Sequence, residues 1–135
     1  MSAIEFKHTI RVPYAHTDQM GVVYYANYLV YFEMARAEMM RTAGTPYGEL
    51  EQRGVVLPVV EAHSVYRSPA RFDDLLEVRT RCTEIRGVRV HIEYEVLRGT
   101  ELLATGYTDH VCMTPAGKVL KPVPELRRLV AGDGA

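Results

Sequence analysis

Apolar and polar residues alternate along much of this chain, with the period of two that indicates half-buried β-strands. The first such stretch lies near the N-terminus, and the others follow residue 54. Short turns that contain glycine separate the last three, so we expect these strands to form an antiparallel meander. The strands are predicted over residues 6–12, 55–68, 75–85, 88–96 and 102–113.

A helical period replaces the alternation between Asn27 and Ala43. Its apolar residues recur at spacings of three and four, and charged residues share the opposite side with further apolar ones. A helix that is apolar beyond one stripe is buried by more than one neighbour, as when a sheet wraps around it. Asn27 suits the N-cap, and Gly44 suits the left-handed position after the last turn. The apolar face is Tyr28, Tyr31, Phe32, Ala35 and Met39; the opposite side holds Glu33, Arg36, Glu38 and Arg41, mixed with Leu29, Val30, Met34 and Met40.

One strand, one long buried helix and then four antiparallel strands predict an α+β fold. Residues 5–130 are expected to form a single domain, because the chain shows no linker or internal repeat. Residues 45–54 are predicted to hold a short helix or an irregular segment, and 124–129 a short terminal helix. Residues 131–135 are expected to be a frayed tail.

Composition narrows the classes of partner and cofactor. The 135 residues carry a net charge of −1, which gives no reason to expect nucleic acid as a partner. No apolar run approaches the roughly 20 residues that span a bilayer, and the N-terminus lacks the pattern of a secretory leader, so we expect a cytoplasmic protein without membrane insertion. Cys82 and Cys112 lie in strand-like runs and are predicted to be buried, reduced thiols. No metal-ligand spacing is present, and no metal or cofactor is expected.

The polar segment before the helix holds the leading candidate for chemistry. Tyr14, His16, Thr17 and Asp18 precede Gly21, where the backbone can turn toward the start of the helix. A carboxylate followed by backbone N–H groups at a helix start can serve as a nucleophile or base beside oxyanion donors. Asp and Thr before a helix are also typical caps and turn formers, so the spacing alone leaves both interpretations open.

The complete string resembles the signature of the 4-hydroxybenzoyl-CoA thioesterase-like family of hot-dog-fold acyl-CoA thioesterases. The resemblance implies a sheet wrapped around one central helix. It also implies that Asp18 is the catalytic carboxylate, acting as nucleophile or general base, and that the backbone N–H of Tyr25 polarises the thioester carbonyl. Two departures are His16, where many members carry Asp, and Tyr25, where the Tol-Pal-associated branch carries His. The matching residues are Arg11-Val12, Thr17-Asp18, Gly21-Val22-Val23, Tyr25, Tyr28, Glu33, Ala35-Arg36, Ser68-Pro69-Ala70-Arg71 and Asp73-Asp74.

Further residues are assigned to substrate binding. The resemblance gives Tyr14 an orienting or acyl-pocket role, and His16 and Tyr28 flank the same segment. Arg67 and Arg71 are candidates for binding the phosphates of coenzyme A, which enters as part of the substrate. The aromatic residues around Asp18 favour an aryl or short-chain acyl group. Glu33 is expected to form a structural salt bridge with Arg36.

The predicted function is hydrolysis of an acyl-CoA to a free acid and CoA. A non-catalytic acyl-CoA sensor and a hydratase or dehydratase of the same fold remain alternatives. One helix cannot cover both faces of the sheet, and sheet edges need pairing or protection. We therefore predict a homodimer whose active sites are lined by both protomers, and the family pattern extends this to a homotetramer.

Overall fold

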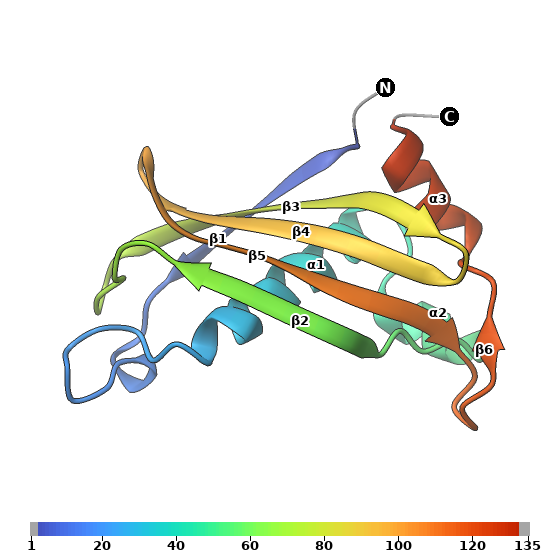
Figure 1. The fold of residues 1–135 in the computed structure, drawn as a ribbon, viewed down its shortest axis with the longest axis horizontal. Helices are drawn as coiled ribbons and strands as arrows, with labels where there is room; N and C mark the ends of the chain where they lie inside the picture. The colour runs from blue at the N-terminus through green and yellow to red at the C-terminus, as the bar shows by residue number, and fades with distance from the viewer. Residues whose placement is uncertain (1–2, 133–135) are drawn as a thin grey trace.

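A curled antiparallel sheet surrounds one long helix in the computed structural model, which describes residues 3–132 (Figure 1). The sheet runs in the order β1-β3-β4-β5-β2, and β6 pairs with β5. The strands are β1 (Glu5–Arg11), β2 (Val59–Tyr66), β3 (Leu75–Arg86), β4 (Arg89–Arg98), β5 (Glu101–Met113) and β6 (Val119–Leu120). The helices are the 3-10 turn η1 (Tyr14–His16), α1 (Asn27–Thr42), α2 (Tyr47–Gln52) and α3 (Pro124–Ala131).

The predicted meander is confirmed as β3, β4 and β5. Gly87 and Gly99 both have φ of +60° in the two connecting turns, a conformation that glycine adopts without strain. The long strand predicted over 55–68 is wrong at its start, because β2 begins at Val59. Before it, Val56 makes only an isolated bridge with Met113, and Pro58 has no N–H to donate to a ladder.

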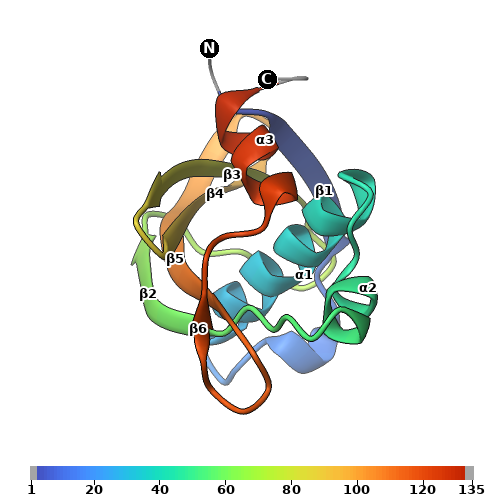
Figure 2. The same cartoon turned by 90° about the vertical axis from the view of Figure 1, so that its right-hand side faces the viewer.

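Helix α1 lies in the concave side of the sheet (Figure 2), and α2 and α3 both lie at the right-hand end of the molecule in Figure 1. Its predicted apolar face is buried, and Phe32 stacks on Tyr94 of β4 with ring centroids 4.4 Å apart. Gly106 of β5 passes so close that a Cβ there would lie 2.5 Å from the Phe32 ring. The core is therefore a helix pressed directly against the middle of the sheet.

Three expectations for α1 are wrong. Asn27 is the first helical residue, Ala26 occupies the N-cap, and the Asn27 side chain instead donates to the His16 carbonyl. Arg36, placed on the polar side, is only 7% exposed, and Met40 is fully buried. No ion pair joins Glu33 and Arg36 in the described part of the chain, because the Arg36 guanidinium turns inward to two tyrosine hydroxyls.

The remaining elements fit the predictions closely. Residues 45–54 contain α2, Gly44 has φ of +86°, and the terminal helix extends to Ala131, while residues 133–135 of the predicted tail lie outside the described residues. Strand β6 is not anticipated by the pattern. Cys82 and Cys112 are buried and free, as predicted, and burial raises the pKa of Cys82 to about 12. No helix within residues 3–132 is long and apolar enough to cross a membrane, and no group of three or more potential metal ligands occurs there.

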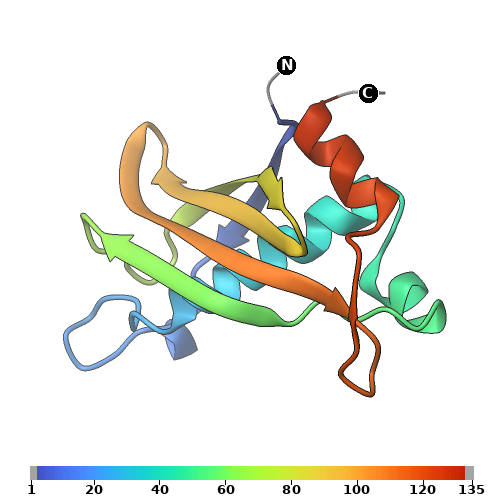
Figure 3. The ribbon, with the colours of Figure 1, turned by 45° about the vertical axis from the view of Figure 1, so that its right-hand side comes forward.

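One border of the fold stays uncovered. β2 ends the strand order and lies along the lower edge of the sheet in Figure 3, with seven of its eight residues exposed. The adjoining side of α1 also exposes apolar side chains. This border carries Leu29, Val30, Met34, Val59, Val60 and Tyr66.

Candidate active site

A tight loop joins β1 to α1 and holds the predicted catalytic segment. Thr17 and Val23 form an antiparallel bridge, and the Asp18 N–H donates to the Val22 carbonyl at 3.0 Å. Gly21, with φ of +77°, closes the loop by donating to the Asp18 carbonyl at 2.9 Å. These contacts fix the backbone on both sides of Asp18.

The Asp18 carboxylate lies at the tip of this loop and is exposed. Its Oδ1 accepts the Met20 N–H at 2.9 Å, which is the turn-forming bond that Asp commonly makes. The pKa of Tyr24 is raised by its hydrogen bond with the Tyr25 side chain and, to a smaller extent, by the charge of Asp18. The charge of the carboxylate is therefore felt at Tyr24, while the carboxylate itself remains open to water.

The backbone N–H of Tyr25 is free to bind a ligand. Two neighbouring donors are used: Tyr24 N–H and Asn27 Nδ2 both donate to the His16 carbonyl, at 2.9 and 3.0 Å. The adjacent Ala26 N–H, like that of Tyr25, has no acceptor in the described part of the chain. The Asn27 N–H donates to the Tyr24 carbonyl. Within residues 3–132, Tyr25 N–H has no acceptor. An unpaired N–H just before a helix is a suitable donor to a developing oxyanion.

A cavity of about 340 Å³ opens beside Tyr25. The Tyr66 hydroxyl donates to the Tyr25 carbonyl at 3.1 Å, and its ring lies 5.0 Å from that of Tyr28. Burial raises the pKa of Tyr28, which keeps its hydroxyl protonated. Three tyrosines thus give the cavity flat, apolar walls. Its lining is Val22, Val23, Tyr25, Tyr28, Tyr66, Arg67, Ser68 and Pro69.

The predicted coenzyme A ligands divide between this cavity and its surroundings. Arg67 lines the cavity, whereas Arg71 is exposed beside it and gives its backbone N–H to Asp74 at 2.9 Å. Arg98 also binds Asp74, at 2.7 Å, and donates to the Pro69 carbonyl. Partial burial opposes ionisation of Asp74, but these hydrogen bonds outweigh it and lower its pKa. The Arg98–Asp74 pair therefore anchors the segment that carries both arginines.

Tyr14 and His16 do not line the tyrosine cavity in the single chain. Tyr14 is 75% exposed and packs edge-on against Phe72, with centroids 5.6 Å apart. His16 Nδ1 lies 2.9 Å from the Tyr31 hydroxyl, so its ring joins the loop to the core. Among the predicted residues, the cavity brings together Tyr25, Tyr28 and Arg67.

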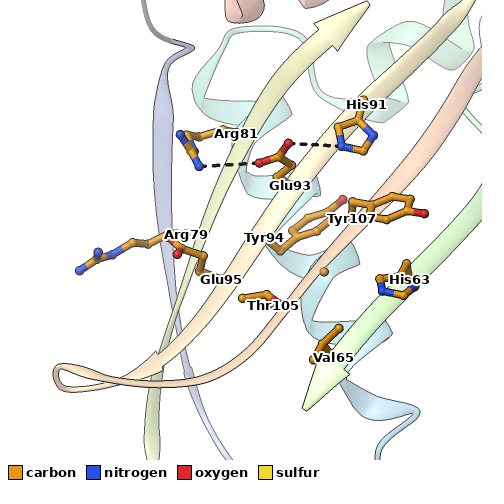
Figure 4. A pocket seen from close by; sticks show the side chains of 11 residues that line it. His63, Val65, Arg79, Arg81, His91, Glu93, Tyr94, Glu95, Thr105 and Tyr107 are labelled. Atoms are coloured by element: carbon orange, nitrogen blue, oxygen red, sulfur yellow. Dashed lines mark ion pairs between the residues drawn. The ribbon is translucent and has the colours of Figure 1, made fainter. Parts of the chain in front are cut away.

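A second hollow, of about 350 Å³, lies on the outer face of the sheet (Figure 4). His91 lies at the upper border of this hollow in Figure 4, with Nδ1 2.6 Å from Asp109 and Nε2 3.3 Å from Glu93. Glu93 also lies 3.8 Å from Arg81, and the Tyr107 ring stacks on His63. Both imidazole nitrogens of His91 are thus occupied by carboxylates of the same chain. This face has the character of a packing surface with paired charges.

The contacts of two residues around α1 could not be predicted from the sequence. Tyr66 contacts the Tyr25 loop from β2, a pairing that depends on how the chain folds back over 41 residues. Arg36 is a charged residue in the core, whereas charged residues of a helix normally face solvent. The sequence contains no local signal for either contact.

Comparison with known proteins gives consistent similarities. Residues 12–127 match the family model described as "Thioesterase-like superfamily". The chain is 37% identical over 119 residues to the acyl-CoA thioesterase YbgC of Haemophilus influenzae, covering 87% of this chain and 86% of that protein. It is 28% identical over 127 residues to a 1,4-dihydroxy-2-naphthoyl-CoA hydrolase of Synechococcus elongatus, covering 93% and 92%. The structure of hypothetical protein TT1821 from Thermus thermophilus superposes with a TM-score of 0.87 at 42% identity, covering 95% and 97%.

Proposed function

Because the chain belongs to the thioesterase-like superfamily and is an acyl-CoA thioesterase with the hot-dog fold, we propose that Asp18 and the backbone N–H of Tyr25 form its catalytic centre. The observation that carries this proposal is the free Tyr25 N–H at the mouth of a tyrosine-lined cavity. The same rigid loop presents the exposed Asp18 carboxylate nearby. The centre thus combines a donor for the carbonyl oxygen with a nucleophile or base.

The reaction follows from these two groups. The thioester carbonyl accepts the Tyr25 N–H, so negative charge that develops on its oxygen is stabilised. Asp18 either attacks the carbonyl carbon or removes a proton from an attacking water. If Asp18 attacks, the C–S bond breaks to leave an acyl–Asp18 anhydride, which water then hydrolyses to the free acid and Asp18. If water attacks, Asp18 takes its proton, and cleavage of the C–S bond gives the free acid directly. In both routes the thiolate of coenzyme A leaves and takes up the proton that water has lost. Only the chain's own residues and water are needed for this chemistry.

The walls of the cavity suggest the class of acyl group. Tyr25, Tyr28 and Tyr66 offer flat apolar surfaces that suit an aryl or short branched acyl group. The similarity to a hydrolase named for an aryl-CoA supports this assignment. Arg67 and Arg71 lie where they can bind the phosphates of coenzyme A. Tyr14 and His16 are assigned to the rim of the site, on the same loop as Asp18.

Free thiol release from a panel of acyl-CoAs tests the proposal. Benzoyl-CoA and isobutyryl-CoA are expected to give a higher kcat/KM than palmitoyl-CoA. A profile led by palmitoyl-CoA would refute the cavity assignment. An acyl-CoA sensor would bind the acyl-CoAs of the panel without releasing thiol. A hydratase would add water to enoyl-CoAs, also without releasing thiol.

The uncovered border of the sheet supports assembly as a homodimer. An exposed edge strand flanked by apolar side chains is poorly protected against pairing. In the proposed dimer, two β2 strands pair antiparallel and join the two sheets. The hollowed outer face of the sheet is the surface that we assign to a further step, from dimer to homotetramer. We also assign the protein to the cytoplasm, where its two thiols stay reduced.

Light scattering across a dilution series tests the assembly. The mass is expected at two or four times 15.3 kDa, and activity should fall in step with mass on dilution. A monodisperse 15.3 kDa monomer that keeps full activity at nanomolar concentration would contradict a shared site.

A further inference from the structure

Arg36 is a cation buried against the sheet without a carboxylate partner. Its Nε donates to the Tyr47 hydroxyl at 3.0 Å, and its Nη1 donates to the Tyr94 hydroxyl at 3.1 Å. No carboxylate in residues 3–132 forms an ion pair with it. Removing a cation from water is costly unless an opposite charge compensates it. The site therefore has an unmet preference for an anion.

The surrounding hydrogen bonds preserve this positive charge. Tyr94 and Thr108 hydroxyls lie 2.6 Å apart, and Thr108 Oγ1 lies 2.8 Å from His110 Nε2. His110 Nδ1 in turn lies 3.1 Å from the Leu57 carbonyl. The chain is satisfied when each group donates to the next, from Arg36 to Leu57, with His110 neutral. Each of these groups then accepts a hydrogen bond on the side nearer Arg36, but none of them carries a negative charge.

The guanidinium is also accessible from a cavity. Arg36 lines a hollow of about 310 Å³ between α1 and β2, and another of about 360 Å³ between α1 and α2. Its Nη2 has no acceptor within residues 3–132 and is not fully enclosed, since it is absent from the buried side-chain atoms that lack a partner there. Apolar side chains form most of the walls, and Glu33 lies at the rim of both hollows.

We propose that Arg36 binds the distal carboxylate of the acyl group, so that among acyl-CoAs of equal chain length those whose acyl chain ends in a second carboxylate are preferred. This assignment rests on the proposed thioesterase function and names its substrate class. A carboxylate can accept two N–H groups of a guanidinium side by side, which makes the pair both strong and directional. The apolar walls accommodate the carbon chain between the thioester and the carboxylate.

The proposed β2 pairing brings this cavity to the reacting thioester. Within one protomer, 11 residues separate Tyr25 from Arg36, roughly 16 Å along a helix, which is too far for a short acyl group. In this proposed pairing, with the two Val59–Tyr66 strands overlapping along their length, the Tyr66 end of one strand lies beside the Val59 end of the partner strand. Tyr66 lines the thioester cavity, and Val59 lines the Arg36 cavity. The acyl group therefore enters from one protomer and ends at the partner's Arg36.

Matched pairs of substrates test the inference. Succinyl-, glutaryl- and adipoyl-CoA are compared with butyryl-, valeryl- and hexanoyl-CoA in the wild-type dimer and in Arg36→Met and Arg36→Lys variants. At least one dicarboxylic member should exceed its neutral match by roughly 10- to 100-fold in kcat/KM, the value of a charged hydrogen bond. Arg36→Met should abolish this ratio, and Arg36→Lys should keep part of it. A purely structural role would lower both members of each pair equally.

Binding without turnover separates this inference from the proposed function. Calorimetry compares hexanoate with hexanamide, and hexanoate is expected to bind more tightly to the wild type but not to Arg36→Met. Glu33→Gln should strengthen hexanoate binding, because it removes a competing carboxylate. If Arg36→Met does not fold, the wild-type ratios decide. The inference is overturned if every dicarboxylic acyl-CoA has a kcat/KM equal to or lower than that of its neutral match. It is also overturned if hexanoate and hexanamide bind equally well. Either result would leave the proposed thioesterase function standing where neutral acyl-CoAs are hydrolysed.

Discussion

The loop of residues 14–26 and the interior around Arg36 each contain one conspicuous charge, but the two regions treat it in opposite ways. Asp18 is exposed and has a single backbone donor, so it can meet substrate and water. Arg36 is 7% exposed and is fixed by tyrosines from α2 and β4. The Asp18 side chain is therefore free to react, whereas the Arg36 side chain is held in one position by its hydrogen bonds. Changes at Asp18 should therefore act on the chemical step, whereas changes around Arg36 should act on stability and on the choice of acyl group.

The largest effect on stability is expected from His110 at low pH. Burial, together with the charge of Arg36, lowers the pKa of His110 to about 4 from an ordinary value of about 6.5. Between these values the unfolded chain binds a proton that the folded chain does not, so the free energy of unfolding falls as pH drops, by about 3 kcal/mol. Urea titrations of wild type and His110→Gln from pH 7.5 to 4 measure the difference.

His8→Gln provides the matched control for this titration. His8 lies on β1, which β3 and β4 separate from the His110 strand β5, so its replacement leaves the hydrogen bonds from Arg36 to His110 in place. Parallel slopes for wild type and His110→Gln would show that the buried imidazole does not titrate as described.

The next largest effect on stability is expected at the contact between α1 and β5. Gly106→Ala places a Cβ 2.5 Å from the Phe32 ring and 2.6 Å from the His63 carbonyl. Overpacking of this kind costs about 1–3 kcal/mol. Gly48→Ala is the control, because no atom lies within 4 Å and the site is helical, so a gain of about 0.5–1 kcal/mol is expected. Equal urea midpoints for the two variants would contradict the close approach of helix and sheet.

A smaller effect, on rate, is expected at Tyr66. Tyr66→Phe removes the hydrogen bond to the Tyr25 carbonyl but keeps the ring beside Tyr28. Loss of this hydrogen bond, worth about 0.5–1.5 kcal/mol of transition-state stabilisation through the position of Tyr25, should lower kcat roughly 2- to 10-fold with little change in KM. Tyr107→Phe, which alters the outer face only, should leave kcat unchanged. The assignment of Tyr66 is wrong if both variants match the wild type in stopped-flow assays.

The same two regions show what sequence can and cannot predict. The turn at Gly21 was predictable because it depends on a local residue preference, whereas the Thr17–Val23 bridge was not predicted and the N-cap was placed one residue too late. The strands of the meander were predictable for the same reason, since their alternation and glycine turns are local. Arg36 was misplaced because the helical period assigns a charge to solvent, and only the tyrosines of α2 and β4 make burial tolerable. Tyr66 depends on β2 crossing to the far edge of the sheet.

The central claim is that Asp18 carries the chemistry from an exposed loop, and one comparison tests it directly. Asp18→Asn keeps an oxygen to accept the Met20 N–H but removes charge and basicity. Its free energy of unfolding should stay within about 0.5 kcal/mol of wild type, and acyl-CoA should still bind, while kcat falls roughly 10²–10⁴-fold. Asp73→Asn is the control, an exposed turn residue with φ of +70° that asparagine also adopts, and it should remain fully active. Near wild-type turnover by Asp18→Asn on benzoyl-CoA would contradict the account.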